Sequence, residues 1–379
     1  MHICFLSPEY PHKLSKPSGG LGTSIKNLAE GLVGKGERIS VIVYGQKEDK
    51  SFSENGIQFY FLKQRYYKVG GWWFYRKYLQ RFLNNLIKTE RVDLVEAPDW
   101  TGISAFINLK CPLLIRLNGS DAYFCHLEGR PQKIKNRFLE KRALQKADAL
   151  ASVSAFTADK TNEIFSLNRK FTVIPNSLKT ENFKPAPVEV IPDRILYFGS
   201  IIRKKGVLEL AGIFNKVVDQ RPDAKLNFIG KDVVDIFEHR STVEMIQERL
   251  STSAEKNVKF ISEVPYEEVQ QHIGEAQVVV LPSFAEALPM TWLEAMAMEK
   301  ALVTSNIGWA HEVMLNGETG YTESPRDHEA YAGKIIKLLD DKLLAQEMGK
   351  NARKRVVEQF SSELIAQSNL EFYRKQIKK

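Results

Sequence analysis

Short runs of apolar residues recur along this chain and alternate with longer segments in which apolar side chains return at helical spacing. Each run is too short for a helix and is typical of a buried strand. Strands that alternate with helices form parallel sheets, so the pattern predicts an α/β fold. The predicted strands include residues 3–6, 39–44, 92–96, 112–117, 195–198, 225–229, 258–261, 278–281 and 301–304.

A segment at residues 183–193 interrupts this alternation, because it contains Pro185, Pro187 and Pro192 and shows no clear periodicity. Prolines without apolar periodicity mark a loop, which is where a domain boundary is expected. The length of 379 residues is also enough for two to three domains, each with a core of its own. We predict an N-terminal domain at residues 1–183, a linker at 184–193, a C-terminal domain at 194–360 and a terminal helix at 361–379.

The composition, 43% hydrophobic and 26% charged, is that of an ordinary globular protein. No apolar stretch approaches the roughly 20 residues that cross a bilayer. The apolar run at residues 1–6 is too short for a signal peptide. Cys4, Cys111 and Cys125 cannot all pair and lack metal-like spacing, so we expect free thiols and a cytoplasmic protein.

The net charge of +8 indicates an anionic partner: a nucleotide diphosphate, phospholipid headgroups or nucleic acid. Basic and aromatic residues interleave between residues 60 and 91, which suits a membrane interface, a nucleic-acid surface or an aromatic substrate groove. The same pattern is equally typical of a helix with one face in the core and a solvated basic face. The members are Lys63, Arg65, Lys68, Arg76, Lys77, Arg81, Lys88, Tyr66, Tyr67, Trp72, Trp73, Phe74, Tyr75 and Tyr78.

Two carboxylates, Glu286 and Glu294, follow the predicted strand at residues 278–281. Ligands of open α/β sheets bind at the carboxyl ends of the strands. If a helix begins near Pro289, the two carboxylates lie at most about 12 Å apart along it, enough to contact two ends of one extended ligand. Backbone N–H groups near this helix start would attract a diphosphate. Two solvated surface glutamates are the alternative.

The amides expected at that helix start belong to Leu288 and Met290, because Pro289 between them has no N–H group. Two other strand ends carry glycines. Gly19 and Gly20 precede a predicted helix. A glycine turn at this place lets backbone N–H groups approach a phosphate, or the glycines have a purely structural role. The other loop, residues 199–206, holds three consecutive cations that could neutralise a phosphate pair or simply be solvated.

Residues 282–321, PSFAEALPMTWLEAMAMEKALVTSNIGWAHEVMLNGETGY, resemble the donor-binding signature of the family 4 glycosyltransferases, retaining enzymes of the GT-B fold. The resemblance covers nearly the whole chain and is most specific over residues 195–321. It implies two Rossmann-like domains facing each other across a cleft, with the terminal helix packing back on the first domain. The matching residues of the signature are Glu286, Glu294, Glu312, Asn316, Gly317 and Gly320.

The resemblance also implies residue roles on the donor side. Glu294 would hold the ribose and Glu286 the donor sugar. Lys205 matches a lysine that binds the diphosphate, whereas Ser200 stands after Gly199 where the family has an arginine, so Arg203 is our candidate substitute. The candidate catalytic residues are therefore Glu286, Lys205 and Arg203. The candidate donor-binding residues are Gly19, Gly20, Gly199, Ser200, Val264, Leu288, Pro289, Met290 and Glu294.

On the acceptor side, Glu96 and Asp99 follow one predicted strand and Asn118 follows the next. These three are the candidate acceptor-binding residues. Relatives often have histidine where Asn118 falls. An asparagine can hydrogen-bond a sugar hydroxyl but cannot take up a proton near neutral pH.

The resemblance therefore implies a retaining glycosyltransferase that moves a sugar from a nucleotide diphosphate sugar to a glycan or lipid-linked acceptor, in polysaccharide or glycoconjugate synthesis. No Asp-x-Asp pair occurs, so we expect no metal and no cofactor besides the nucleotide sugar co-substrate. We expect no nucleic-acid partner, and we expect peripheral association with the inner face of the membrane. A GT-B-type epimerase or phosphorylase, or a silent nucleotide-sugar-binding subunit, are the alternatives.

Overall fold

The computed structural model describes residues 1–379 except 17, 186, 263 and 379, and it consists of two compact units. The first unit contains Met1–Ser177 and Phe360–Lys379, and the second contains Leu178–Gln359. The proline-rich segment predicted as a linker belongs to the second unit. Its backbone is held there, because the N–H of Ile191 donates to the carbonyl of Glu275 and that of Asp193 to the side chain of Gln277.

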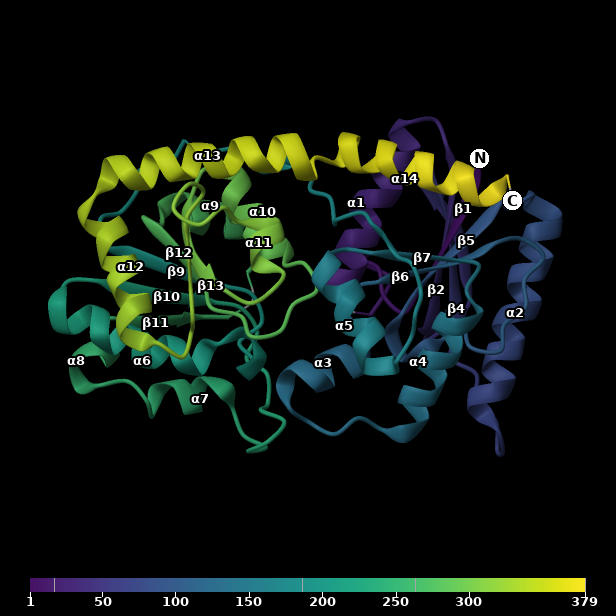
Figure 1. The fold of residues 1–379 in the computed structure, drawn as a ribbon, viewed down its shortest axis with the longest axis horizontal. Coiled ribbons are helices and arrows are strands. Elements are labelled where there is room, and N and C mark those ends of the chain that lie inside the picture. Colours follow the sequence, from purple (N-terminus) through teal and green to yellow (C-terminus); the bar gives the residue numbers. More distant parts are fainter. Residues whose placement is uncertain (17, 186, 263, 379) are drawn as a thin grey trace. The chain divides into compact units, whose positions relative to one another are not determined.

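The sheet of the first unit runs in the order β3-β4-β2-β1-β5-β6-β7-β8 (Figure 1). Neighbouring strands from β4 to β8 are parallel, and β3 pairs antiparallel with β4. Strands β1 and β5 are neighbours although β2, β3 and β4 come between them in sequence, so a topological switch point lies beside β1. The strands are β1 (His2–Ser7), β2 (Arg38–Gln46), β3 (Lys50–Glu54), β4 (Ile57–Lys63), β5 (Leu94–Pro98), β6 (Leu113–Leu117), β7 (Ala149–Ser152) and β8 (Thr172–Val173).

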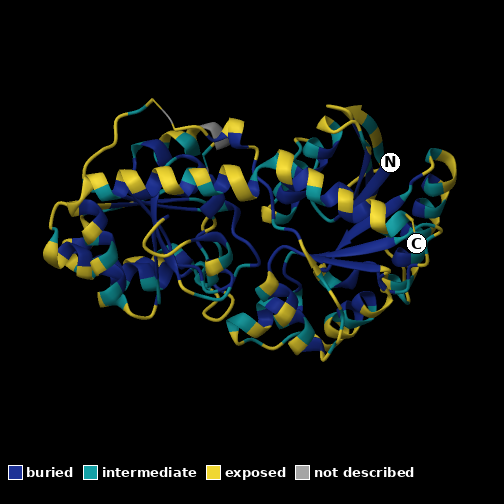
Figure 2. Cartoon of the chain, turned by 45° about the horizontal axis from the view of Figure 1, so that its top comes forward, coloured by how far each residue is buried: buried dark blue, intermediate teal, exposed yellow. Residues whose placement is uncertain are grey.

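Strand β1 is buried along its whole length because helices cover both faces of this sheet. Ile3 and Phe5 pack in the same cluster as residues of α1 (Gly20–Gly34) and α14 (Ser362–Ile377). Cys4 and Leu6 point to the other face and pack in the same cluster as residues of α2 (Gly71–Glu90). Figure 2 shows the buried strands in dark blue between helices with exposed outer faces. The other helical segments of this unit are η1 (Trp100–Gly102), α3 (Asp121–Glu128), α4 (Ile134–Lys146) and α5 (Ala155–Phe165).

The sheet of the second unit is parallel and runs in the order β11-β10-β9-β12-β13-β14. Its switch point lies between β9 and β12, where the strand order reverses, so the loops that follow these two strands meet at one edge. The strands are β9 (Arg194–Phe198), β10 (Lys225–Ile229), β11 (Val258–Ile261), β12 (Val278–Leu281), β13 (Ala301–Ser305) and β14 (Tyr321–Glu323).

Helices cover the second sheet and end with α13, which runs to the boundary between the units. Among the helices of the described chain, none combines the length and the apolar character needed to span a membrane. The helical segments of this unit are η2 (Thr180–Asn182), η3 (Arg203–Lys205), α6 (Val207–Gln220), α7 (Thr242–Gln247), α8 (Thr252–Glu255), α9 (Tyr266–Glu275), α10 (Met290–Ala297), α11 (Ala310–Val313), α12 (His328–Asp340) and α13 (Lys342–Phe360).

Candidate functional site

The loops after β9 and β12 touch each other at the switch point of the second unit. Gly206 ends the first loop with φ of +72°, and a Cβ at this position would lie 2.0 Å from the carbonyl oxygen of Pro282. The backbone N–H of Phe284 donates to the carbonyl oxygen of Lys204 at 2.8 Å. Glycine is therefore required at position 206 because the two loops approach closer than any side chain would permit.

This contact brings two predicted site residues together, Lys205 from the first loop and Glu286 from the second. The ammonium of Lys205 forms an ion pair with the carboxylate of Glu286. Their side chains are 19% and 12% exposed. An ion pair at such a partly buried edge is less screened than a surface pair, so each charge stabilises the other.

Helix α10 begins beside the same loop. Pro289 is its N-cap in extended conformation and Met290 is its first residue. The N–H groups of the first helical turn have no intrahelical acceptor and carry a partial positive charge. Glu294 lies further along α10 and is 5% exposed, and Leu288 is also buried. A cation, a carboxylate and a helix N-terminus thus meet at the carboxyl edge of the sheet, which suits a diphosphate with a polar group next to it.

Arg203 belongs to the same loop as Lys205, but its guanidinium is engaged elsewhere. It donates to both oxygens of Asp235, at 2.8 and 3.0 Å, and to Glu238 at 3.0 Å. It also lies 5.3 Å from the ring centre of Phe237. The hydrogen bonds from Arg203 lower the pKa of Asp235 to about 2. These bonds use Nε and Nη2 of Arg203, so a diphosphate could be contacted by Nη1, or by the whole guanidinium only after it leaves Asp235.

A cavity of about 740 Å³ opens at the carboxyl ends of β10 and β11 and is lined in part by Lys231, Phe260 and Ser262. Both strands were predicted from the sequence, but none of these three residues was among the predicted site residues. Ser200, on the neighbouring loop, is exposed, and its carbonyl accepts a hydrogen bond from Tyr197. Val264 is half-buried beyond β11, and Glu263 before it lies outside the described residues.

In the first unit, the loop between β1 and α1 contains a carboxylate that the sequence reading did not select. Oε1 of Glu9 accepts hydrogen bonds from the backbone N–H groups of Gly19, at 3.0 Å, and Gly22, at 2.8 Å. Gly20 is the exposed first residue of α1. The amide of Gly19, predicted to face a diphosphate, is therefore already bound to Glu9 in this structure.

Glu96 lies in the interior of the first unit. Its carboxylate accepts hydrogen bonds from Nε and Nη2 of Arg116, at 2.6 and 3.0 Å, and from the hydroxyl of Tyr373 at 2.6 Å. Nη2 of Arg116 also donates to Asn369. Glu96 is 5% exposed and lies within β5 rather than in the loop after it. Its geometry is that of a buried ion pair that fastens α14 to the sheet, and nothing in this position favours contact with an acceptor.

Asp99 and Asn118 do lie together, at the carboxyl ends of β5 and β6. The backbone N–H of Asn118 donates to Oδ1 of Asp99 at 3.1 Å. Oδ2 of Asp99 and Oδ1 of Asn118 are buried and have no hydrogen-bond partner among the described residues. Burial raises the pKa of Asp99 to about 8. A neutral carboxyl can donate one hydrogen bond, so the pair offers both a donor and acceptors to a hydroxyl group.

Aromatic and basic side chains from α2, α4 and the turn at Phe106 form one surface of the first unit, which we call the aromatic–basic face. The ring of Phe106 lies 5.1 Å from that of Trp73 and 6.1 Å from that of Phe138. The ammonium of Lys135 lies 5.7 Å from the ring of Trp72. The members of the face are Trp72, Trp73, Lys77, Phe106, Ile134, Lys135, Phe138 and Arg142.

Arg76 is not part of this face, although the sequence pattern grouped it with the exposed cations. It is buried and donates hydrogen bonds to the carbonyl oxygens of Trp72 and Gly102. Burial lowers the pKa of its guanidinium to about 10. Its task is to join α2 to the turn that begins at Trp100.

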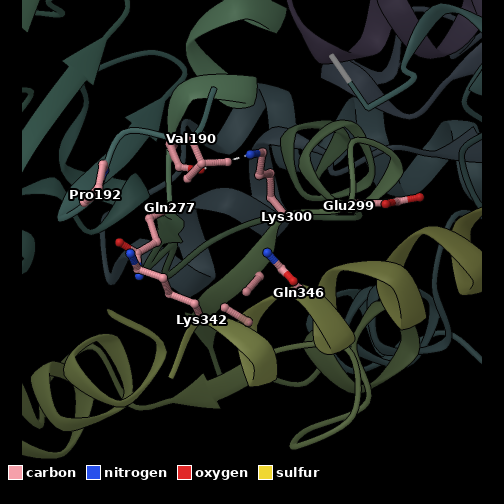
Figure 3. A pocket seen from close by; sticks show the side chains of 10 residues that line it. Val190, Pro192, Gln277, Glu299, Lys300, Lys342 and Gln346 are labelled. Atoms are coloured by element: carbon pink, nitrogen blue, oxygen red, sulfur yellow. Dashed lines mark hydrogen bonds between the residues drawn. The ribbon is translucent and has the colours of Figure 1, made fainter. Parts of the chain in front are cut away.

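A small cavity of about 140 Å³ lies at the amino ends of β12 and β13, the edge of the second sheet away from Glu286 (Figure 3). Lys300 lines this cavity and donates hydrogen bonds to the carbonyl oxygens of Gly274, at 2.5 Å, and Ala276, at 3.0 Å. Burial lowers its pKa to about 8. The ammonium closes the carbonyl end of α9, so we interpret it as structural.

Two family models match the chain in succession. The model described as "Glycosyltransferase Family 4" matches residues 18–182, and "Glycosyl transferases group 1" matches residues 179–355. Glycogen synthase of Mycobacterium tuberculosis is 25% identical over 292 residues, which are 75% of this chain and 69% of the relative. The capsular polysaccharide biosynthesis glycosyltransferase CapM of Staphylococcus aureus is 30% identical over 176 residues, 45% of this chain and 42% of the relative.

Among solved structures, HepE of Anabaena in complex with UDP superimposes with a TM-score of 0.76. The match has 16% identity and covers 99% of this chain and 100% of the other. At this identity the likeness establishes the shared fold.

Proposed function

The chain belongs to the family 4 glycosyltransferases and has the GT-B fold, and on that premise we propose that it transfers a sugar from a nucleotide diphosphate sugar, with retention of the anomeric configuration. The observation that carries this proposal is the ion pair of Lys205 and Glu286 beside the N-terminus of α10. A diphosphate needs cations and free amides, and a sugar needs a carboxylate to accept its hydroxyl hydrogens. The UDP in HepE supports a nucleotide ligand for this fold.

In the proposed reaction the bond between the anomeric carbon and the leaving phosphate oxygen breaks, and a bond to an acceptor hydroxyl oxygen forms on the same face. The hydroxyl proton passes to the leaving phosphate oxygen. Lys205 and the first amides of α10 stabilise the charge that develops on the diphosphate. Glu286 orients the donor sugar and Glu294 holds the ribose. Because these groups supply the positive charge, the proposed reaction needs no metal.

We propose that the acceptor is a glycan or a lipid-linked sugar and that Asp99 and Asn118 hydrogen-bond one of its hydroxyl groups. CapM, which acts in capsular polysaccharide biosynthesis by its name, supports a polysaccharide context. We also propose that the aromatic–basic face brings the enzyme to an anionic membrane surface, because exposed aromatic rings beside cations suit the headgroup region. The enzyme would then work in the cytoplasm at the inner face of the membrane.

The test begins with a thermal-shift screen of nucleotide sugars, followed by mass spectrometry of a hit incubated with and without cell extract. A glycosyltransferase attaches the sugar to a component of the extract and releases the nucleotide diphosphate in equal amount. Conversion of the nucleotide sugar without any acceptor would indicate an epimerase instead. Binding without turnover under both conditions would indicate a silent binding subunit.

A further inference from the structure

A cavity of about 310 Å³ lies in the first unit, between the loop that follows β1 and the turn that joins β2 to β3. This volume is at the lower end of the range typical of ligand sites, about 300–1,000 Å³. Four lysines and one glutamate are among its lining residues. We call it the lysine pocket and define it by Lys13, Lys16, Lys47, Lys50 and Glu48.

The charge of the lysine pocket is only partly compensated. Lys50 forms an ion pair with Glu48 at 2.6 Å, and the ammonium of Lys16 donates to the carbonyl oxygen of Gly45 at 2.6 Å. Within the described part of the chain, neither Lys13 nor Lys47 forms an ion pair with a carboxylate. Cations around a hollow surface focus a positive potential into it, which attracts anions.

The backbone around the lysine pocket is organised before any ligand arrives. The N–H of Ser15 donates to the carbonyl oxygen of His12 at 2.9 Å. The N–H of Lys16 donates to the side chain of Gln46 at 3.3 Å, which joins the loop after β1 to the end of β2. Gln46 is itself buried. Such preorganisation lowers the entropic cost of binding.

The pocket also lies at the edge of the sheet where ligands of this fold class bind. Strands β1, β2, β5 and β6 are parallel, so the loops after β1 and β2 share an edge with Asp99 and Asn118. We propose that the lysine pocket binds a phosphate group carried by the acceptor, an inference that rests on the proposed sugar transfer. Lysine ammonium groups act on phosphate oxygens as compact point charges with three donors each.

This phosphate could belong to a soluble sugar phosphate or to the headgroup of a membrane lipid. The probes are therefore glycerol 3-phosphate, a soluble monoester, and vesicles of phosphatidylglycerol. The test variant carries Lys13→Gln and Lys47→Gln. The matched control carries Lys88→Gln and Lys110→Gln, which remove the same charge near the amino ends of β5 and β6. A third variant, Lys205→Ala, tests whether the probes bind to the candidate diphosphate site of the second unit instead.

We expect at least one probe to bind the full-length wild type, in a calorimetric titration or by co-sedimentation, and to bind the test variant about tenfold or more weakly. The control and Lys205→Ala should bind it like the wild type. If the test variant binds glycerol 3-phosphate more weakly than the wild type does, the ligand is a soluble phosphate. If the test variant binds only the vesicles more weakly, the ligand is a lipid headgroup. Equal binding by wild type and test variant, or no binding of either probe, would overturn the proposal.

These titrations involve no turnover, so a protein that binds the probe through Lys13 and Lys47 but transfers no sugar would contradict only the proposed function. In the opposite case, sugar transfer whose acceptor KM is the same in the test variant and the wild type would leave the function standing. That result would remove the lysine pocket from acceptor binding.

Discussion

The ammonium of Lys205 contacts the carboxylate of Glu286, although the two residues lie 81 positions apart in the sequence. They meet because β9 and β12 are neighbours and the loops after them touch at the switch point. In this state each residue neutralises the other. A diphosphate that enters the site therefore competes with Glu286 for the charge of Lys205, whose ammonium has three N–H donors.

This relationship predicts opposite effects for the two residues. Glu286→Gln removes the carboxylate that orients the sugar but leaves Lys205 without its competing partner. We expect kcat to fall by about two orders of magnitude or more, as for loss of one group that stabilises a transition state, while the Kd for the nucleotide diphosphate stays the same or decreases. Lys205→Ala should instead weaken nucleotide diphosphate binding by about 1.5–3 kcal/mol, because a charge-assisted hydrogen bond is lost.

Calorimetric titration with the nucleotide diphosphate and steady-state kinetics separate the two effects. Lys204→Ala is the matched control, since it removes the same charge from the neighbouring position. Turnover near that of the wild type in Glu286→Gln would remove this residue from the mechanism. An unchanged affinity of Lys205→Ala for the nucleotide diphosphate would show that Lys205 does not bind the ligand and only contributes to the structure of its loop.

The second prediction concerns Arg203, which donates hydrogen bonds to Asp235. Asp235 belongs to the segment beside the cavity of about 740 Å³ at the carboxyl ends of β10 and β11. If the arginine positions this segment, Arg203→Ala and Asp235→Asn should weaken nucleotide binding to a similar extent. The double variant should then be little worse than either single variant, because both remove one interaction. If Arg203 instead moves to the diphosphate, Asp235→Asn should leave binding unchanged or improve it, and only Arg203→Ala should weaken it.

Much of the fold follows from the sequence pattern because apolar runs directly report buried strands. The predicted runs at residues 225–229, 258–261 and 278–281 coincide with β10, β11 and β12. Strands β3 and β4 were not predicted. Strand β3, KSFSE, is largely polar and pairs at the sheet edge, so it lacks the apolar run that marks a buried strand.

The candidate site could be predicted only where it is local in sequence. The spacing of Glu286 and Glu294 places both beside the start of α10, and family resemblance marked Lys205. Tertiary partners are not visible in such patterns. The sequence therefore could not show that Glu96 forms a hydrogen-bonded ion pair with Arg116, or that Arg203 forms one with Asp235.

The third prediction is a pH dependence of stability from Asp99, whose pKa burial raises to about 8. Between the ordinary value and about 8, the folded state holds a proton that the unfolded state has lost. The free energy of unfolding therefore falls as pH rises through this window, by about 1.4 kcal/mol per pH unit, and the loss ends above the folded pKa. In Asp99→Asn the position cannot ionise, so this contribution disappears.

Urea unfolding of both proteins from about pH 5 to about pH 9 measures the difference. Asp99→Asn should gain stability relative to the wild type as pH rises. Glu140, whose pKa burial raises to about 7, is present in both proteins, so the difference reports the ionisation of Asp99 together with its coulombic repulsion from Glu140. Parallel stability curves would show that Asp99 is ionised in the folded protein.

The fourth prediction is that sugar transfer survives an excess of chelator. Lys205 and the amides at the start of α10 supply the positive charge for the leaving diphosphate in the proposed reaction, so no metal has to bridge it. Initial rates with and without EDTA, after prior dialysis against the chelator, provide the measurement. Complete loss of activity that Mg²⁺ or Mn²⁺ restores would contradict these electrostatics.

The last prediction concerns the aromatic–basic face. Trp72 and Phe138 are 39% and 56% exposed, and Lys135 lies beside Trp72. A cation near an anionic leaflet contributes about 1 kcal/mol, and exposed rings settle at the headgroup level. We therefore expect the protein to co-sediment with liposomes in proportion to their anionic lipid content and to dissociate at high salt.

Replacing Trp72 and Phe138 by serine and Lys135 by glutamine should weaken this binding about tenfold or more. Leu343→Ser with Lys350→Gln is the control, because it removes an exposed apolar residue and an exposed cation from α13 of the second unit. The control should sediment like the wild type. A wild-type protein that stays in the supernatant at every lipid composition would identify the face as a solvated surface, and the acceptor should then be sought among soluble molecules.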